Sequence, residues 1–292
     1  MSCSVVRRSV SGVFLLLFLF IPVFLSCSGG GKKIVDVEEL HIQDSIDSAN
    51  DTLHLVPEEP EPPKAVDELF DDFFYTFVNK PSFQLRRINF PLKCCEGDAV
   101  KEVNRDDWQQ FNRFSSQEFF SVIYEHDDDM QVQKDTAINR VSVEWIYLQD
   151  NYVETYTFRR FKSKWILMTM QVSDIDDLPN GDFLKFYAQF VADSAFHSQS
   201  VHQPLKLTIT DDAYDGEELS DEQDTLLSVE DWMAMKEEYP IPQDALVNID
   251  YGQPNQSHSR KTLLMEGMSN GLFIKFKFHR EDGSWKLTEI EN

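Results

Sequence analysis

The sequence has few of the residues from which nucleotide and metal sites are built. Its 292 residues include only 11 glycines and four cysteines, and three of the glycines fall together at positions 29–31. No Gly-x-Gly-x-x-Gly, phosphate-loop or Gly-x-Ser-x-Gly pattern occurs, and the seven histidines include no His-Glu-x-x-His spacing. We therefore expect no cofactor and no transition-metal site.

Basic side chains are also scarce, since 27 Lys and Arg stand against 51 Asp and Glu, for a net charge of −24. This balance argues against nucleic-acid binding, which depends on Lys and Arg neutralising phosphates, and against adhesion to anionic lipid by charge. The chain is nevertheless 41% hydrophobic and contains 23 phenylalanines, which is too apolar for a disordered protein. A packed interior rich in Phe is expected.

The apolar run near the N-terminus, residues 13–25, is too short to span a bilayer, which takes about 20 residues. It follows Arg7 and Arg8, an order typical of a signal peptide. The run ends in Phe24-Leu25-Ser26-Cys27, which resembles the lipobox of bacterial lipoproteins in the looser form found in Bacteroidetes. The resemblance implies a signal peptide over residues 1–27 and a diacylated Cys27 that anchors the chain. A plain signal peptide with an incidental cysteine is the alternative.

Residues 28–64 are predicted to be a flexible acidic tether, because they lack periodicity and end in a proline-rich stretch at 57–63. We expect anchoring in the outer membrane. The segment 28–33 carries no acidic residue, whereas the surface-export signal of related lipoproteins is acidic, so the periplasmic side is favoured over the cell surface.

The strongest feature of the sequence is an internal repeat. A shift of 113 residues superimposes the residues Phe70, Phe73, Phe77, Phe83, Pro91, Leu92 and Lys93 on Phe183, Phe186, Phe190, Phe196, Pro204, Leu205 and Lys206. Asp107-Trp108 matches Asp231-Trp232 at a shift of 124, and Trp165 matches Trp285 at a shift of 120. Two domains are therefore predicted, at residues 65–178 (the first repeat) and 179–292 (the second repeat).

Each repeat is predicted to begin with an amphipathic helix and to end with antiparallel strands. Apolar residues recur at three- and four-residue spacing over 66–78 and 183–191. Residues 140–149, 152–161 and 164–172 are rich in β-branched and aromatic residues and are separated by short polar breaks. Within the intervening strand, Cys94 is expected to be buried and Cys95 exposed, because neighbours in a strand point to opposite faces. A strained vicinal disulfide or a redox role is the alternative.

The opening helix, the Pro-Leu-Lys strand and the closing Trp-x-Leu strand together resemble the nuclear-transport-factor-2-like (NTF2-like), or cystatin-like, fold. The whole arrangement is similar to Bacteroidetes lipoproteins with tandem domains of this kind and resembles domain of unknown function 4348. The resemblance implies an α+β fold of two tandem cones, each with its N-terminal helix packed in a curved antiparallel sheet. Members of that superfamily include both enzymes and non-enzymatic binding modules, so the fold does not choose between them.

Carboxylates on apolar strands are the candidates for catalysis, because superfamily enzymes hold an acid or base between helix and sheet. Glu144 shares a strand face with Ile146 and Leu148, and a buried carboxyl there would have a raised pKa. Asp107 and Asp231 precede the repeated Trp, where a helix cap beside a core aromatic is the other interpretation.

Two further groups are candidates for binding. Asp211, Asp215 and Glu222 match part of a calcium loop, but Ala213 replaces one ligand, which favours a solvated acidic insertion. The second group consists of rings that either line a ligand pocket or pack in the core: Trp145, Tyr147, Tyr156 and Trp165.

The sequence favours a non-catalytic envelope lipoprotein whose two domains pack as an intramolecular pseudo-dimer. Its expected partners are the membrane, through the N-terminal lipid, and an envelope protein, a glycan or a small apolar ligand. The alternative is an enzyme that acts on a small apolar or glycan-derived ligand with a buried carboxylate in one cone.

Overall fold

The computed structural model describes residues 64–109, 111–210, 222–255, 257–268 and 270–292. Cys27, the predicted signal peptide and the tether up to residue 63 lie outside the described residues. The described residues belong to one compact unit. None of the helices among them is both long and apolar enough to cross a membrane.

The first repeat contains η2 (Lys64–Asp67), α2 (Phe70–Asn79), α3 (Pro81–Arg86), β1 (Ile88–Glu96), β2 (Ala99–Val103), η3 (Arg105–Asp107), α4 (Phe111–Ser115), β3 (Phe119–Tyr124), η4 (Asp127–Lys134), β4 (Arg140–Tyr147), β5 (Tyr152–Phe161) and β6 (Lys164–Asp174). The second repeat, entered through η5 (Ile175–Asp177), contains α5 (Gly181–Ala192), α6 (Ser194–Gln199), β7 (Val201–Thr210), β8 (Glu222–Leu227), α7 (Val229–Met235), η6 (Lys236–Glu238), β9 (Ala245–Asp250), β10 (Arg260–Gly267), β11 (Phe273–Glu281) and β12 (Ser284–Glu291). The fold is α+β, as predicted.

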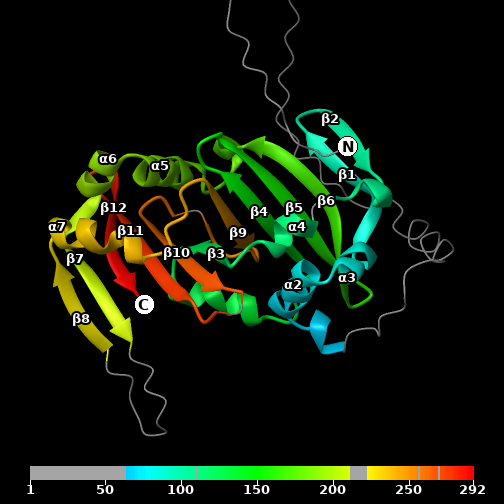
Figure 1. Ribbon diagram of the computed structural model, residues 1–292, viewed down its shortest axis with the longest axis horizontal. Helices are drawn as coiled ribbons and strands as arrows, with labels where there is room; N and C mark the ends of the chain where they lie inside the picture. Colours follow the sequence, from blue (N-terminus) through cyan, green and yellow to red (C-terminus); the bar gives the residue numbers. More distant parts are fainter. Residues whose placement is uncertain (1–63, 110, 211–221, 256, 269) are drawn as a thin grey trace, which may run out of the picture. The chain divides into compact units, whose positions relative to one another are not determined.

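All twelve strands form one sheet in the order β2-β1-β6-β5-β4-β9-β3-β10-β11-β12-β7-β8 (Figure 1). The third strand of each repeat is exchanged, because β3 pairs with β10 and β9 pairs with β4. The two pairings have the same register: Glu144 lies opposite Asn248, and Leu264 lies opposite Val122. β3 and β9 meet each other at a single parallel pair. The repeats are thus joined through strands that each contributes to the other's half of the sheet.

The expectation of a purely antiparallel sheet is wrong. β1 runs parallel to β6, and β7 runs parallel to β12, with a register shift at the same place in both pairs. The closing meander sets the direction of β6 and β12. β1 and β7 instead enter the sheet from a helix, so the meander places no constraint on their direction.

The repeated aromatic residues have similar surroundings in the two repeats. Phe70 meets Phe158 at 5.4 Å and Trp165 at 5.1 Å between ring centroids. In the second repeat, Phe183 meets Phe278 at 5.2 Å and Trp285 at 5.5 Å. Such edge-on packing is favourable beyond the burial of the rings. The repeated phenylalanines are therefore core residues that attach α2 and α5 to the sheet.

The two helices lie on opposite faces of the sheet. Trp145 of β4 packs in the α2 core, edge-on to Phe114 at 5.4 Å. Ile146 and its partner on β9, Leu246, point the other way, and both belong to the hydrophobic cluster around α5. Each repeat therefore has a helix-covered face and an outer face.

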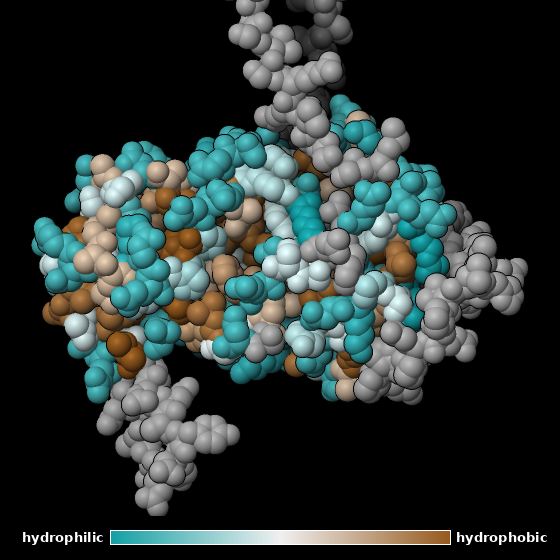
Figure 2. Space-filling view, viewed as in Figure 1, coloured by the Kyte–Doolittle hydropathy of each residue, from teal (hydrophilic) through white to brown (hydrophobic). Residues whose placement is uncertain are grey.

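The surface of the described part is mostly polar in one view. Figure 2 shows hydrophilic residues over much of this face, with hydrophobic side chains reaching the surface near β7 and β8. Ile209 and Leu226 of these strands are 45% and 67% exposed. Single exposed apolar residues of this kind are ordinary on protein surfaces.

Candidate functional site

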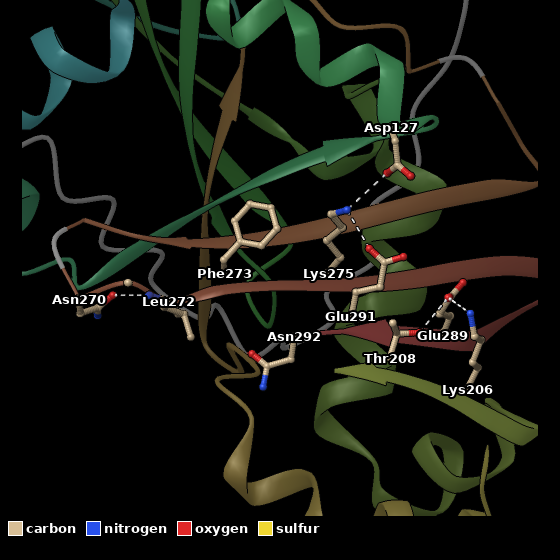
Figure 3. A pocket seen from close by; sticks show the side chains of 11 residues that line it. Asp127, Lys206, Thr208, Asn270, Leu272, Phe273, Lys275, Glu289, Glu291 and Asn292 are labelled. Atoms are coloured by element: carbon tan, nitrogen blue, oxygen red, sulfur yellow. Dashed lines mark hydrogen bonds and ion pairs between the residues drawn. The ribbon is translucent and has the colours of Figure 1, made fainter. Parts of the chain in front are cut away.

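A polar pocket of about 840 Å³ lies on the outer face of the second repeat (Figure 3). Its floor consists of alternate residues of β7, β11 and β12, whereas the residues between them, Leu207, Ile274 and Ile290, are buried in the α5 cluster. Its volume falls in the range of about 300–1,000 Å³ that is usual for ligand pockets. The pocket is lined by Asp127, Lys206, Thr208, Asn270, Gly271, Leu272, Phe273, Lys275, Glu289, Glu291 and Asn292.

Ion pairs organise the floor. Glu289 accepts a hydrogen bond from Lys206 Nζ at 3.0 Å, and Glu291 accepts one from Lys275 Nζ at 2.8 Å (Figure 3). The neighbouring Lys277 also bonds Glu291 and lies 3.5 Å from Glu289. Burial opposes the charge of Lys277, but these carboxylates nevertheless hold its pKa above the ordinary value. The hydrogen bonds from Lys275 and Lys277 likewise outweigh burial and lower the pKa of Glu291.

The first repeat contributes one wall of the pocket. Asp127, at the start of η4, lies 3.9 Å from Lys275 Nζ and accepts a hydrogen bond from Tyr124 at 3.3 Å. Because β3 is exchanged into the second half of the sheet, η4 follows it there. The strand exchange therefore places Asp127 over the outer face of the other repeat.

The rim carries an aromatic ring and two carboxamides. Phe273 is 50% exposed, and its ring lies beside Lys275 in Figure 3. The tight loop before it has Gly271 at φ +72°, and Asn270 Oδ1 accepts a hydrogen bond from the backbone of Leu272 at 3.1 Å. Asn292 lines the pocket from the end of β12. Glycine suits the loop because other residues rarely adopt a positive φ.

Glu144 lies elsewhere, on the outer face of the first repeat. Asn248 Nδ2 donates to Glu144 Oε2 at 2.8 Å, while Asn248 Oδ1 accepts from the backbone of Ile123 at 3.0 Å. Burial and the nearby Asp250 charge raise the pKa of Glu144 to about 7. Burial also raises the pKa of Asp250. The carboxyl is thus titratable near neutral pH, but it points away from α2, on the face of the sheet from which Ile146 joins the α5 cluster.

Three of the four predicted binding rings lie together. The guanidinium of Arg113 is 4.4 Å from the ring centroid of Trp145 and 5.3 Å from that of Tyr147. Tyr156 donates to Glu154 at 3.0 Å, and Arg113 forms an ion pair with the same carboxylate. Trp145 and Tyr156 are buried, which fits packing better than an open ligand platform.

Trp165 is separate from this group, since it is fully buried against Phe70. Of the partial calcium loop, Asp211 and Asp215 lie outside the described residues, and Glu222 begins β8. Among the described residues there is no group of three or more His, Cys, Asp or Glu that could hold a metal ion.

The remaining candidates have structural roles. Asp231 forms a capping box with Ser228 at the start of α7, and Asp107 lies at the end of η3, where Asn104 donates to it at 3.4 Å. Cys94 is buried and Cys95 partly buried, and the two form no disulfide with each other. The helix-cap interpretation of Asp231 is therefore the one that its contacts support.

The pocket was missed by reasoning from sequence, although a signal was present. Lys275-Phe276-Lys277-Phe278 alternates charged and aromatic residues, which indicates a strand with one polar face. Asp127 carried no such signal, because only the exchange of β3 brings it to that strand.

Comparison with known proteins identifies relatives of this chain. The family DUF4348, described as a domain of unknown function, matches residues 48–292. A crystal structure of an NTF2-like protein from Bacteroides fragilis is 34% identical, covers 80% of this chain and 98% of its own, and superimposes with a TM-score of 0.69. No curated protein matches. These similarities confirm the family and the fold that the sequence resembled.

Proposed function

Because this chain belongs to the DUF4348 family and has the NTF2-like fold, we propose that it is a non-catalytic binding module anchored in the bacterial envelope. In this proposal two NTF2-like domains, at residues 65–178 and 179–292, form an intramolecular pseudo-dimer. The ligand occupies the polar pocket on the outer face of the second repeat, and the N-terminal lipid holds the module at the membrane.

The observation that carries the proposal is the aromatic packing between helix and sheet in both repeats. The ring of Phe158 lies within 5.2–6.2 Å of Phe70, Phe73, Phe74 and Phe77. Phe278 is packed in the same way at 5.2–6.4 Å from Phe183, Phe186, Tyr187 and Phe190. A ligand placed between these helices and the sheet would have to displace rings that contact one another, which requires a rearrangement of packed side chains. Binding at the outer pocket requires no such rearrangement.

Photo-crosslinking in intact cells tests whether the pocket is occupied. Benzoylphenylalanine replaces Phe273, with Tyr75 replaced in the same way as the matched control, since the two rings are 50% and 48% exposed. A specific adduct at position 273 that is absent at position 75 supports binding. Equal labelling at both positions, or none at either, contradicts it.

Anchoring is tested separately. Metabolic labelling with an alkyne fatty acid is expected to label the wild type and not Cys27→Ser, and the wild type is expected in the outer-membrane fraction. Added protease should leave the protein intact in whole cells if it faces the periplasm. Label that persists in the Cys27→Ser variant would contradict lipidation at this residue.

Catalysis by Glu144 is the second candidate function, favoured by its pKa of about 7 and its oriented Asn248 partner. A carboxyl of this pKa can accept and release a proton near neutral pH. Its place on an outer face, away from the helix, is the reason that binding is preferred. If any turnover is found, Glu144→Gln should abolish it, and unchanged turnover would remove Glu144 from the mechanism.

A further inference from the structure

The geometry of the outer pocket points to a neutral oligosaccharide as its ligand, bound once per chain. This inference rests on the proposed binding function and adds the chemical class of the ligand. Three features carry it: an exposed ring at the rim, carboxylates and carboxamides that can form hydrogen bonds with hydroxyl groups, and a charge balance that opposes anions.

The ring of Phe273 provides an apolar platform. It is half-exposed at the rim of a pocket whose floor is otherwise charged. One face of a pyranose ring presents C–H groups that pack on an aromatic face, while the hydroxyl groups around its edge point outward to polar partners. A purely apolar ligand would match Phe273 but would remove water from the ion pairs of the floor without replacing the hydrogen bonds that water makes to them.

Hydroxyl groups suit the rest of the lining. Glu289, Glu291 and Asp127 contribute carboxylates, and Asn270 and Asn292 contribute carboxamides. A carboxylate has about four acceptor positions, so a carboxylate bound to one or two lysines can still accept a hydrogen bond from a sugar hydroxyl. The carboxamides both donate and accept, as a hydroxyl group does.

The charge of the pocket opposes acidic ligands. Three carboxylates line it beside two ammonium groups. When the ion-pair partners Asp224 and Lys277 are included, the count is four carboxylates against three ammonium groups, and each lysine is paired with a carboxylate. A phosphate, sulfate or uronic acid would have to displace these partners and would face a net negative lining. Repulsion of that kind is an effective basis of selectivity.

The first repeat does not reproduce the site. The β-strand registers place Thr155, Thr169 and Gln171 where the second repeat has Lys275, Glu289 and Glu291. The ion-paired floor therefore exists only in the second repeat, and one ligand per chain is expected despite the duplication.

Isothermal titration of the full-length protein in detergent tests the inference. The probes are hexasaccharides of α-1,4-glucose, β-1,4-glucose, β-1,4-N-acetylglucosamine, β-1,4-xylose and α-1,6-mannose, with hexagalacturonate as the acidic comparison. At least one neutral probe should bind with a stoichiometry of one and more tightly than hexagalacturonate. Phe273→Ala and Asn292→Ala should each weaken it at least tenfold, and Tyr75→Ala should leave it unchanged.

The inference is overturned if no neutral probe binds, if the acidic probe binds more tightly, if two molecules bind per chain, or if both pocket variants bind as the wild type does. Thermal melts of the variants verify that each is folded. A crosslinked adduct at position 273 without oligosaccharide binding would refute the ligand class alone. Absence of both the adduct and the binding would refute the proposed function as well.

Discussion

The indole N–H of Trp232 donates to Nε2 of His197 at 2.9 Å, and Nδ1 of the same imidazole lies 3.1 Å from the backbone oxygen of Phe190. In the first repeat, Trp108 donates to Oε1 of Gln84 at 2.6 Å, and Gln84 donates in turn to a backbone oxygen seven residues earlier. The neutral imidazole and the carboxamide therefore occupy equivalent positions and make equivalent hydrogen bonds. The imidazole can make both only while it carries a single proton.

Replacement of His197 by Gln should make the folded protein less sensitive to acid, because the free energy of unfolding should fall less as the pH is lowered. Burial lowers the pKa of His197 from 6.5 to about 4. The unfolded chain then binds more protons than the folded chain between these values, so the stabilisation is complete above about pH 6.5 and is lost as the pH falls towards 4. The difference is at most about 3 kcal/mol.

Urea unfolding of the wild type and His197→Gln at about pH 7.5 and pH 4.5 measures this effect. The variant should lose less free energy of unfolding on acidification, and the reciprocal change Gln84→His should lose more. An equal loss in the wild type and His197→Gln would contradict the assigned protonation state.

Replacement of Glu144 by Gln should have the opposite pH signature. The pKa of Glu144 is raised from 4.5 to about 7, so the folded chain binds the additional proton, and stability falls as the pH rises through this interval. Glu144→Gln should therefore unfold at higher urea concentration than the wild type at about pH 8 and at a similar concentration near pH 4.5. The exposed Glu102→Gln serves as the control, and an equal response of both variants would argue against burial of the Glu144 charge.

Loss of Lys261 should destabilise the contact between the repeats. Lys261 of β10 forms an ion pair with Glu125, which follows β3, at 2.9 Å, and both side chains are buried. Lys261→Met leaves the Glu125 carboxylate buried without its partner, at a cost of about 3–5 kcal/mol. The double variant Lys261→Met with Glu125→Leu should recover most of the lost stability, because no unpaired charge remains buried.

The matched control for that experiment is the exposed pair Lys185–Asp176. Lys185→Met should change the free energy of unfolding far less than Lys261→Met does, because exposed pairs contribute little. If Lys261→Met were as mild as Lys185→Met, the ion pair would not be buried in solution.

When the two repeats are expressed as separate chains, each should lose strand pairing that it has in the intact protein. In each isolated repeat, β3 or β9 loses the strand of the other repeat with which it pairs, and an exposed strand edge promotes association. We expect residues 65–178 and 179–292 to self-associate when expressed singly and to form one complex when expressed together. Size-exclusion chromatography distinguishes these outcomes, and two soluble monomers as stable as the intact chain would show that the pseudo-dimer is wrong.

Local sequence patterns were sufficient for several parts of this fold. Strands over 140–147, 152–161 and 164–174 agree closely with the predicted meander. The Asp-Gly pair before β12 is a strong signal for a tight hairpin turn, and Asp282 and Gly283 both have the positive φ that this turn requires. Glu144 was identified as a candidate carboxyl because it interrupts an apolar strand face, although its orientation away from the helix was not predictable.

The sequence by itself determined the duplication, the amphipathic helices and the strands, because periodicity and turn residues act between near neighbours. Only the tertiary structure decided which strands pair. β3 can form the same backbone hydrogen bonds with β4 as with β10, since backbone donors and acceptors are alike in every strand. The choice depends on packing between residues more than 100 positions apart, as for Val122 and Leu264. That choice brings Asp127 to the pocket and Glu125 to Lys261, and no local pattern records it.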